Sequence, residues 1–147
     1  MRKAIYLDMD GTIANLYAVD NWLEQLRAFN ANPYAEAEPL VRMASLARML
    51  NICQSRGDHI AIVSWLSKES TPEFDEAVTK AKMAWLKAHL PSVQFDEIRI
   101  VAYGTPKGDV VSYPNGILFD DESRNRYEWV GEAYDPENLL DILRDLL

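Results

Sequence analysis

Short apolar runs alternate with longer amphipathic segments along this chain, and the alternation predicts its secondary structure. The apolar runs are rich in branched and aromatic side chains and are too short for helices, which is typical of buried strands. They cover residues 3–7, 59–63, 97–104 and 115–122. The amphipathic segments repeat apolar residues at helical spacing, so they predict helices over residues 19–30, 39–57, 70–91 and 135–147.

Turn and cap residues support these boundaries. Gly57 ends the second predicted helix as a C-terminal cap would. Pro72 stands in the first turn of the third predicted helix, and Pro91 follows its last turn. Residues 105–113 begin like one further short helix.

Strands that alternate with helices predict a mostly parallel sheet with helices on both faces, which is an α/β, Rossmann-like fold. The length of 147 residues suits one domain, so we expect a single domain over residues 1–147. A small helical insertion after the first strand, over residues 13–39, is a candidate cap. Ligands in such sheets bind beyond the carboxyl ends of the strands.

Polar side chains gather at the carboxyl ends of the predicted strands. They are Asp8 and Asp10 after the first strand, Ser64 after the second, Lys107 after the third, and Asp120 and Asp121 after the fourth. Because the carboxyl ends of parallel strands meet at one edge of a sheet, we expect one crevice to collect all six side chains.

This set of side chains suits phosphoryl chemistry. Four carboxylates in one crevice need a cation, and oxygen ligands without His or Cys indicate a hard ion, best matched by Mg²⁺. One carboxylate can attack phosphorus, while a second acid protonates the leaving oxygen and later activates water. A hydroxyl and an ammonium group would bind the phosphoryl oxygens. The predicted catalytic residues are Asp8, Asp10, Ser64 and Lys107, and the predicted metal residues are Asp8, Asp10, Asp120 and Asp121.

Each of these residues also has a purely structural interpretation. Asp-x-Asp-Gly commonly forms a turn, and Ser64 or the pair Asp120-Asp121 can cap a helix. Lys107 can be a solvated surface charge. The occurrence of all four signals at four consecutive strand ends favours the catalytic interpretation.

Charge and composition narrow the range of partners. The formal net charge of −8 disfavours a polymeric nucleic acid partner, because its phosphate backbone would be repelled. Cys53 is the only cysteine, so no disulfide forms within the chain. We see no leader-like segment and no apolar run long enough to span a membrane, so we expect a cytoplasmic protein. A homodimer through the last helix is left open.

At these residues the sequence resembles the haloacid dehalogenase (HAD) superfamily of phosphohydrolases. The first motif of that family, Asp-x-Asp-Gly-Thr, is matched by residues 8–12, and the second, an apolar strand ending in Ser or Thr, by residues 60–64. The third motif is a lysine before the last strand, matched by Lys107. The fourth is an apolar strand ending in two acids, matched by residues 118–121.

The resemblance implies a role for each matched residue. Asp8 would be the nucleophile, and Asp10 the general acid and base. Mg²⁺ would be held by Asp8, the backbone carbonyl of Asp10, and Asp120, with Asp121 close by. The phosphoryl group would be bound by the hydroxyl and the ammonium group of the second and third motifs.

Within the superfamily, the Asp-Met-Asp-Gly opening and the Asp-Asp-Glu ending look most like the 5′-nucleotidase and deoxyribonucleotidase branch. Members of that branch carry a larger helical cap than residues 13–57 supply. Trp65 directly after Ser64 is also unexpected there.

The resulting hypothesis is a Mg²⁺-dependent phosphomonoester hydrolase that acts through an aspartyl-phosphate on Asp8. Its substrate is expected to be a nucleoside monophosphate or another small phosphate ester. The alternatives are a phosphatase for sugar phosphates or polynucleotide ends, and a non-enzymatic phosphoacceptor or binding module. Asp10 separates the last alternative from the others, since a phosphoacceptor needs no acid and base two residues after its aspartate.

Aromatic side chains are candidates for contacts with the substrate. We expect Tyr17 and Trp65 to face the site, where they can stack on a base. Trp22 and Phe29 stand at helical spacing, which predicts a place in the core instead. His59 and His89 have no partner at metal-ligand spacing, so we expect them to be structural.

Overall fold

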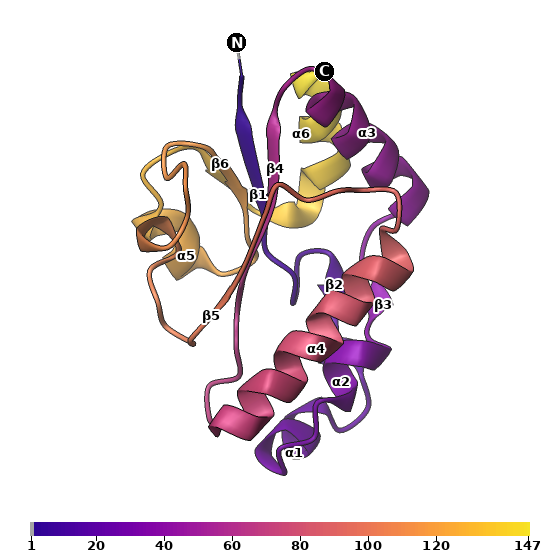
Figure 1. The fold of residues 1–147 in the computed structure, drawn as a ribbon, viewed down its shortest axis with the longest axis vertical. Coiled ribbons are helices and arrows are strands. Elements are labelled where there is room, and N and C mark those ends of the chain that lie inside the picture. Colours follow the sequence, from indigo (N-terminus) through magenta and orange to yellow (C-terminus); the bar gives the residue numbers. More distant parts are fainter. Residues whose placement is uncertain (1) are drawn as a thin grey trace.

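Five parallel strands form the central sheet of the computed structural model, which describes residues 2–147 (Figure 1). The strand order is β5-β4-β1-β6-β7, and each neighbouring pair is parallel. The strands of this sheet are β1 (Ala4–Leu7), β4 (His59–Trp65), β5 (Glu97–Val101), β6 (Ile117–Phe119) and β7 (Ala133–Tyr134). The predicted parallel α/β fold is confirmed, with β1 at the centre.

Helices connect these strands, as the amphipathic segments predicted. The α-helices are α1 (Trp22–Arg27), α2 (Asn32–Glu36), α3 (Met43–Ser55), α4 (Pro72–His89), α5 (Ser123–Glu128) and α6 (Leu139–Leu146). The 3-10 turns are η1 (Leu16–Ala18), η2 (Lys107–Asp109) and η3 (Pro136–Asn138).

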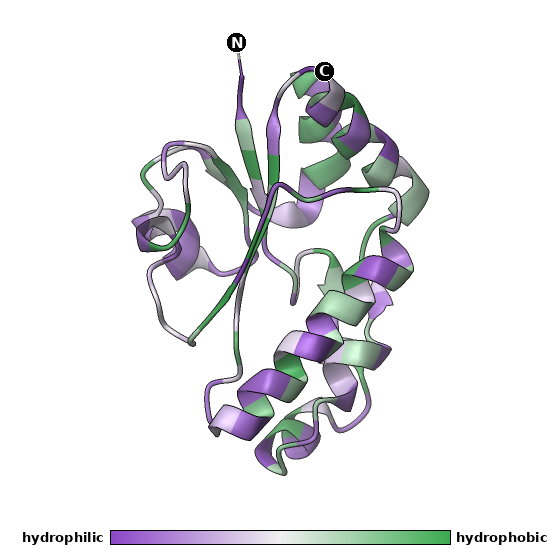
Figure 2. Cartoon of the chain, viewed as in Figure 1, coloured by the Kyte–Doolittle hydropathy of each residue, from purple (hydrophilic) through white to green (hydrophobic). Residues whose placement is uncertain are grey.

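Apolar cores cover both faces of the sheet. Successive side chains of a strand point to opposite faces, so β1 contributes to both cores. Ile5 and Leu7 belong to the larger apolar core, which includes residues of α3 and α6. Tyr6 belongs to the opposite core, where it meets Trp129 directly after α5. Figure 2 shows α6 as predominantly hydrophobic and α5 as predominantly hydrophilic. The central strand is therefore buried on both sides and gives a rigid base to the residue that follows it.

The insertion over residues 13–39 forms a small unit with paired ends. Its first and last parts, β2 (Ala14–Asn15) and β3 (Glu38–Pro39), form an antiparallel ribbon. Between them, η1, α1 and α2 share an apolar cluster with α4. The indole Nε1 of Trp85 on α4 also donates a hydrogen bond of 2.7 Å to the carbonyl of Ala37. The insertion is thus docked on α4.

The structure differs from the sequence predictions mainly in its shortest elements. The helix predicted over residues 19–30 shrinks to α1, because Asn21 and Phe29 at its two sides both adopt a left-handed φ of 57°. The helix expected to begin in residues 105–113 is only the single turn η2. Strand β7 and helix α5 were not predicted, since two and six residues are too few for a periodic signal.

A buried polar network fixes the segment between β5 and β6. The carboxylate of Glu97 accepts hydrogen bonds from the Tyr6 hydroxyl and from the backbone N–H of Ser112, and it pairs with His59. Burial alone would raise the pKa of Glu97, but hydrogen bonds from Arg99, His59 and Tyr6 lower it to about 2. The network holds this segment against the edge of the sheet.

The last helix, α6, packs its apolar face against the core of its own chain. Leu139 and Leu143 of α6 are buried in the core that includes α3. The apolar face that could have indicated a homodimer is therefore covered within the chain. None of the helices within residues 2–147 is long and apolar enough to cross a bilayer.

Candidate active site

Asp8 lies at the centre of the carboxyl edge of the sheet, as predicted. Asp8 is only 6% exposed, and its Oδ1 accepts a hydrogen bond of 2.9 Å from the ammonium of Lys107. The same ammonium donates to Oδ2 of Asp120 at 2.6 Å. Burial alone would lower the pKa of Lys107, but the charges of Asp8 and Asp120 raise it. The structure thus joins predicted residues from the first, third and fourth strand ends.

The turn after β1 is shaped by Gly11 and Thr12. Gly11 has a φ of +80°, and a Cβ there would lie 2.2 Å from Oδ2 of Asp121. The Thr12 hydroxyl donates to Oδ2 of Asp8 at 3.1 Å and accepts from the backbone N–H of Asp121 at 3.2 Å. One small residue and one hydroxyl therefore bring two strand ends together.

Asp8, Asp120 and Asp121 form a compact carboxylate cluster. Each offers one oxygen, and these three oxygens all lie within 4.8 Å of one another. Burial and the negative charge of Asp8 raise the pKa of Asp120 to about 6 and that of Asp121 to about 8. Lys107 is the only lysine or arginine in residues 2–147 that forms an ion pair with this cluster.

The cluster fits a hard divalent cation. Three carboxylates face one ammonium group, so the cluster keeps a negative charge whenever the carboxylates are ionised. Oxygen-only donors are the ligands that Mg²⁺ prefers. Asn125 donates a hydrogen bond of 3.1 Å to Oδ2 of Asp120 and so helps to hold that carboxylate in place.

The carboxylate of Asp10 lies outside this cluster. Its Oδ2 accepts a hydrogen bond of 2.9 Å from the ammonium of Lys82 on α4. Burial raises the pKa of Asp10, an effect that the charge of Lys82 opposes. Of the four carboxylates predicted to bind metal, the structure therefore brings together only three through their side chains. The predicted contribution of Asp10 through its backbone carbonyl stays a prediction.

Ser64 lies deeper than expected for a phosphoryl ligand. Ser64 is completely buried, and its Oγ accepts a hydrogen bond of 2.6 Å from the ammonium of Lys82. It is not among the residues that line the pocket described next. Its predicted role toward the phosphoryl group stays a prediction.

Lys82 is a buried charged residue at the candidate site that sequence reasoning missed. The sequence did contain a signal: Lys82 stands at helical spacing between the apolar residues Val78 and Trp85. A lysine on the buried face of an amphipathic helix needs a charged partner.

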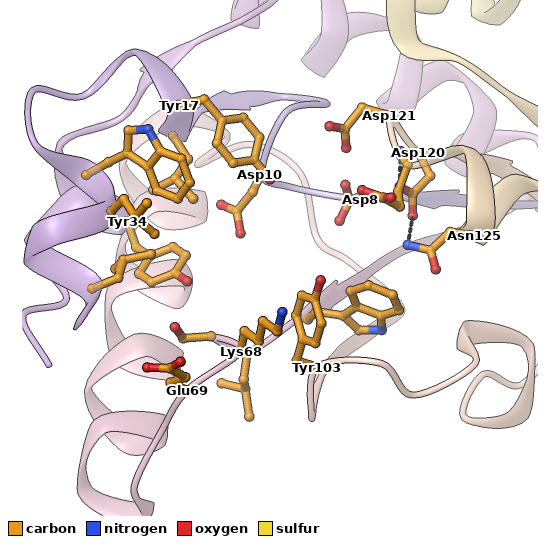
Figure 3. Close-up of a pocket in the computed structure, with 18 of the residues that line it drawn as sticks. Asp8, Asp10, Tyr17, Tyr34, Lys68, Glu69, Tyr103, Asp120, Asp121 and Asn125 are labelled. Carbon is orange, nitrogen blue, oxygen red and sulfur yellow. Dashed lines mark hydrogen bonds between the residues drawn. The ribbon is translucent and has the colours of Figure 1, made fainter.

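A pocket of about 310 Å³ opens in front of Asp8. Figure 3 shows the carboxylate cluster at one end of it and Tyr34 at the other, with Asp10 between them. Its wall is rich in aromatic side chains, and the basic side chains Arg27 and Lys68 also line it. The aromatic residues in the wall are Tyr17, Trp22, Tyr34, Trp65 and Tyr103.

The aromatic predictions have mixed outcomes. Tyr17 and Trp65 line the pocket as expected, and the centre of the Trp65 ring lies 5.5 Å from the ammonium nitrogen of Lys107. Trp22 packs against the apolar cluster that the insertion shares with α4, as its spacing predicted, and it also lines the pocket beside Tyr17. Phe29 is half-exposed and packs edge-on against Phe74, away from the site.

The two histidines lie elsewhere. His59 pairs with Glu97 at the opposite end of β4, and His89 packs against Trp85. Neither belongs to a group of potential metal ligands among the described residues.

Comparison with known proteins gives a similarity of fold. The sequence matches no protein-family model and no curated protein sequence. The fold is similar to the crystal structure of D,D-heptose 1,7-bisphosphate phosphatase from Burkholderia thailandensis, with a TM-score of 0.56 and 12% sequence identity. The alignment covers 99% of this chain and 98% of that chain. At this identity the likeness bears on the fold, and it supports the Rossmann-like architecture over the full length.

Proposed function

We propose that this protein is a Mg²⁺-dependent phosphomonoester hydrolase that acts through an aspartyl-phosphate on Asp8. The observation that carries the proposal is the pairing of Asp8 with the buried ammonium of Lys107, beside two further carboxylates, at the carboxyl end of the central strand. The fold shared with a heptose bisphosphate phosphatase and the four motifs that resemble the HAD superfamily support the same reaction class.

The side chains can divide the reaction between them. An oxygen of Asp8 would attack phosphorus, and the bond from phosphorus to the ester oxygen would break. Asp10 would give its proton to that leaving oxygen and later take a proton from the water that cleaves the aspartyl-phosphate. Lys107 would neutralise charge on the phosphoryl oxygens.

Asp8, Asp120 and Asp121 are the side chains that would hold Mg²⁺. When bound, the ion would lower the repulsion between the anionic nucleophile and the anionic phosphoryl group. Asn125 and Thr12 would keep these carboxylates in place through the hydrogen bonds that they already make.

For the substrate we propose a nucleoside monophosphate. The aromatic rings that line the pocket suit a flat base, since stacking is worth about 1–3 kcal/mol per base. The basic side chains Arg27 and Lys68 line the same wall and can contact the phosphate, although Glu69 and Glu122 line it too. A sugar phosphate would make less use of this aromatic wall, although a heptose bisphosphate is what the protein of similar fold is named for.

The test is phosphate release from a panel of phosphomonoesters, with Mg²⁺ or EDTA, by wild type and by Asp8→Asn. We expect release that requires Mg²⁺ and that falls at least about 1,000-fold in Asp8→Asn, because the nucleophile is lost. Nucleoside monophosphates should exceed sugar phosphates in kcat/KM.

Two results would contradict the proposal. Release that survives in Asp8→Asn would exclude this nucleophile. Labelling of Asp8 by a phosphoryl donor without turnover of any ester would favour the phosphoacceptor alternative.

A further inference from the structure

We infer that Lys82 is a positioning residue that ties the acid and base Asp10 to the end of strand β4. The inference deepens the proposed function and rests on it. Lys82 lies on α4, outside the four motifs, and its contact with Asp10 joins residues that are 72 positions apart in the sequence.

The surroundings of Lys82 leave its ammonium no freedom. The residue is completely buried, and an ammonium group has three donors. Two of them are used at the end of β4, by the Oγ of Ser64 at 2.6 Å and the carbonyl of Trp65 at 2.7 Å. The third is donated to Oδ2 of Asp10 at 2.9 Å. The ammonium is therefore anchored on a rigid strand, and its remaining donor sets the place of one Asp10 oxygen.

The two buried lysines of the site serve different carboxylates. Lys107 contacts Asp8 and Asp120, the nucleophile and a carboxylate of the proposed metal cluster. Lys82 contacts Asp10 and neither of those two. This division keeps the carboxylate of Asp10 out of the cluster while Asp10 still lines the pocket. The second oxygen of Asp10 stays available for the leaving oxygen of a substrate.

Lys82 also connects Asp10 to the insertion. Its ammonium lies 4.9 Å from the centre of the Tyr34 ring, which belongs to α2 and lines the same pocket. Tyr34 shares an apolar cluster with Val78 of α4, one turn before Lys82. The helix that docks the insertion is thus the helix that positions the acid.

A misplaced acid has a specific kinetic signature. General acid catalysis matters most for esters whose leaving group is a poor one, such as the alkoxide of a nucleoside 5′-monophosphate. It matters little for p-nitrophenyl phosphate, whose phenolate leaves without a proton. Loss of positioning should therefore change the ratio of kcat/KM between these two substrates, whereas a general loss of active protein lowers both values equally.

The experiment compares Lys82→Met with Lys80→Met. Lys80 is on the same helix but is solvent-exposed, so it is the matched control. In Lys82→Met we expect kcat/KM to fall at least about 100-fold for a nucleoside monophosphate and less than about fivefold for p-nitrophenyl phosphate. In Lys80→Met both values should stay within about twofold of wild type. A Lys82→Met variant whose two values fall by the same factor would overturn the inference.

Asp10→Asn supplies the second measurement. If Lys82 acts through Asp10, the double variant Asp10→Asn, Lys82→Met should have the same substrate ratio as Asp10→Asn alone. Effects that multiply in the double variant would overturn the inference. Lys82→Met alone leaves the carboxylate of Asp10 buried without its partner, and the variant can fail to fold for that reason. The double variant removes both charges, so its substrate ratio can still be measured and compared with that of Asp10→Asn. A folded wild type without activity on either ester would overturn the proposed function, and with it this inference.

Discussion

At the scale of single residues, the turn after β1 determines how close the carboxylates can come. Gly11 leaves room for the side chain of Asp121. The Thr12 hydroxyl donates a hydrogen bond to Asp8 and accepts one from the backbone N–H of Asp121. A position that combines a left-handed φ with a close neighbour has no tolerance for a side chain.

The first prediction concerns Gly11→Ala. The new methyl group would overlap Oδ2 of Asp121 and would meet a φ of +80°, so the carboxylate must move away from the cluster. We expect weaker Mg²⁺ binding and a loss of kcat/KM of at least about tenfold, measured by titrating Mg²⁺ in the phosphate-release assay. Gly104→Ala is the control, because it has a similar φ of +87° with no atom within 4 Å. Equal losses in the two variants would show that backbone strain, and not Asp121, is responsible.

At the scale of elements, α4 is the platform on which the insertion rests. Trp85 is almost completely buried, and its indole holds the carbonyl of Ala37 at the end of the insertion. The same helix carries Lys82, so the position of α4 affects both the pocket wall and the carboxylate of Asp10, the proposed acid.

The second prediction concerns Trp85→Phe. The variant leaves the carbonyl of Ala37 without its donor and leaves space in the core, so we expect a loss of about 2–4 kcal/mol in the free energy of unfolding. Because the insertion lines the pocket, KM for a nucleoside monophosphate should rise several-fold. Trp129→Phe is the matched control, since its indole donates to Gly116 on the other face of the sheet. It should lose stability without the change in KM, as measured by urea unfolding and steady-state kinetics.

The third prediction concerns the segment that carries Lys107. Glu97 has a pKa lowered to about 2, so its contribution to stability is present above its usual pKa and is lost as the pH falls toward 2. We expect Glu97→Gln to destabilise the protein by about 1–3 kcal/mol at neutral pH and by clearly less near pH 3. Urea unfolding at the two pH values checks this, with Glu76→Gln as the control, because Glu76 forms only an exposed ion pair with Lys80 and should contribute less than about 0.5 kcal/mol. A loss that does not depend on pH would mean that the charge of Glu97 is unimportant.

At the scale of the whole molecule, a chain of net charge −8 places three carboxylates at the centre of its sheet edge. The pKa values of Asp120 and Asp121 are raised to about 6 and about 8. Their ionisation therefore costs stability in the metal-free protein. This cost is absent below their usual pKa, grows as the pH rises from there to about 6 for Asp120 and to about 8 for Asp121, and is constant above those values.

The fourth prediction follows from this sign. A divalent cation competes with protons for the cluster, so Mg²⁺ should stabilise the protein more as the pH rises. We expect saturating Mg²⁺ to raise Tm by a few degrees near pH 8 and by almost nothing near pH 5, relative to EDTA. Asp121→Asn should reduce the shift near pH 8. A larger shift at the lower pH would contradict the assignment of the cluster.

Much of the fold and part of the site were predictable from sequence for one physical reason. Parallel strands end at one edge of their sheet, so Asp8, Asp120 and Asp121 were expected to meet once the strands were recognised, and Lys107 reaches them from the turn η2 beyond β5. The same rule does not place side chains in detail, since Asp10 and Ser64 also follow strands but contact Lys82 instead of the cluster. Strand β7 and helix α5 were not predictable, because so few residues carry no periodic signal.

The sequence by itself determined the strand ends and the kinds of side chain that meet there, because those depend on local periodicity and on the geometry of a parallel sheet. Only the tertiary structure decided how the carboxylates are divided between two lysines and which aromatic rings line the pocket. Those features depend on how α4 and the insertion dock on each other. Docking is set by long-range packing, and no local pattern around Asp10 announces a lysine 72 residues away.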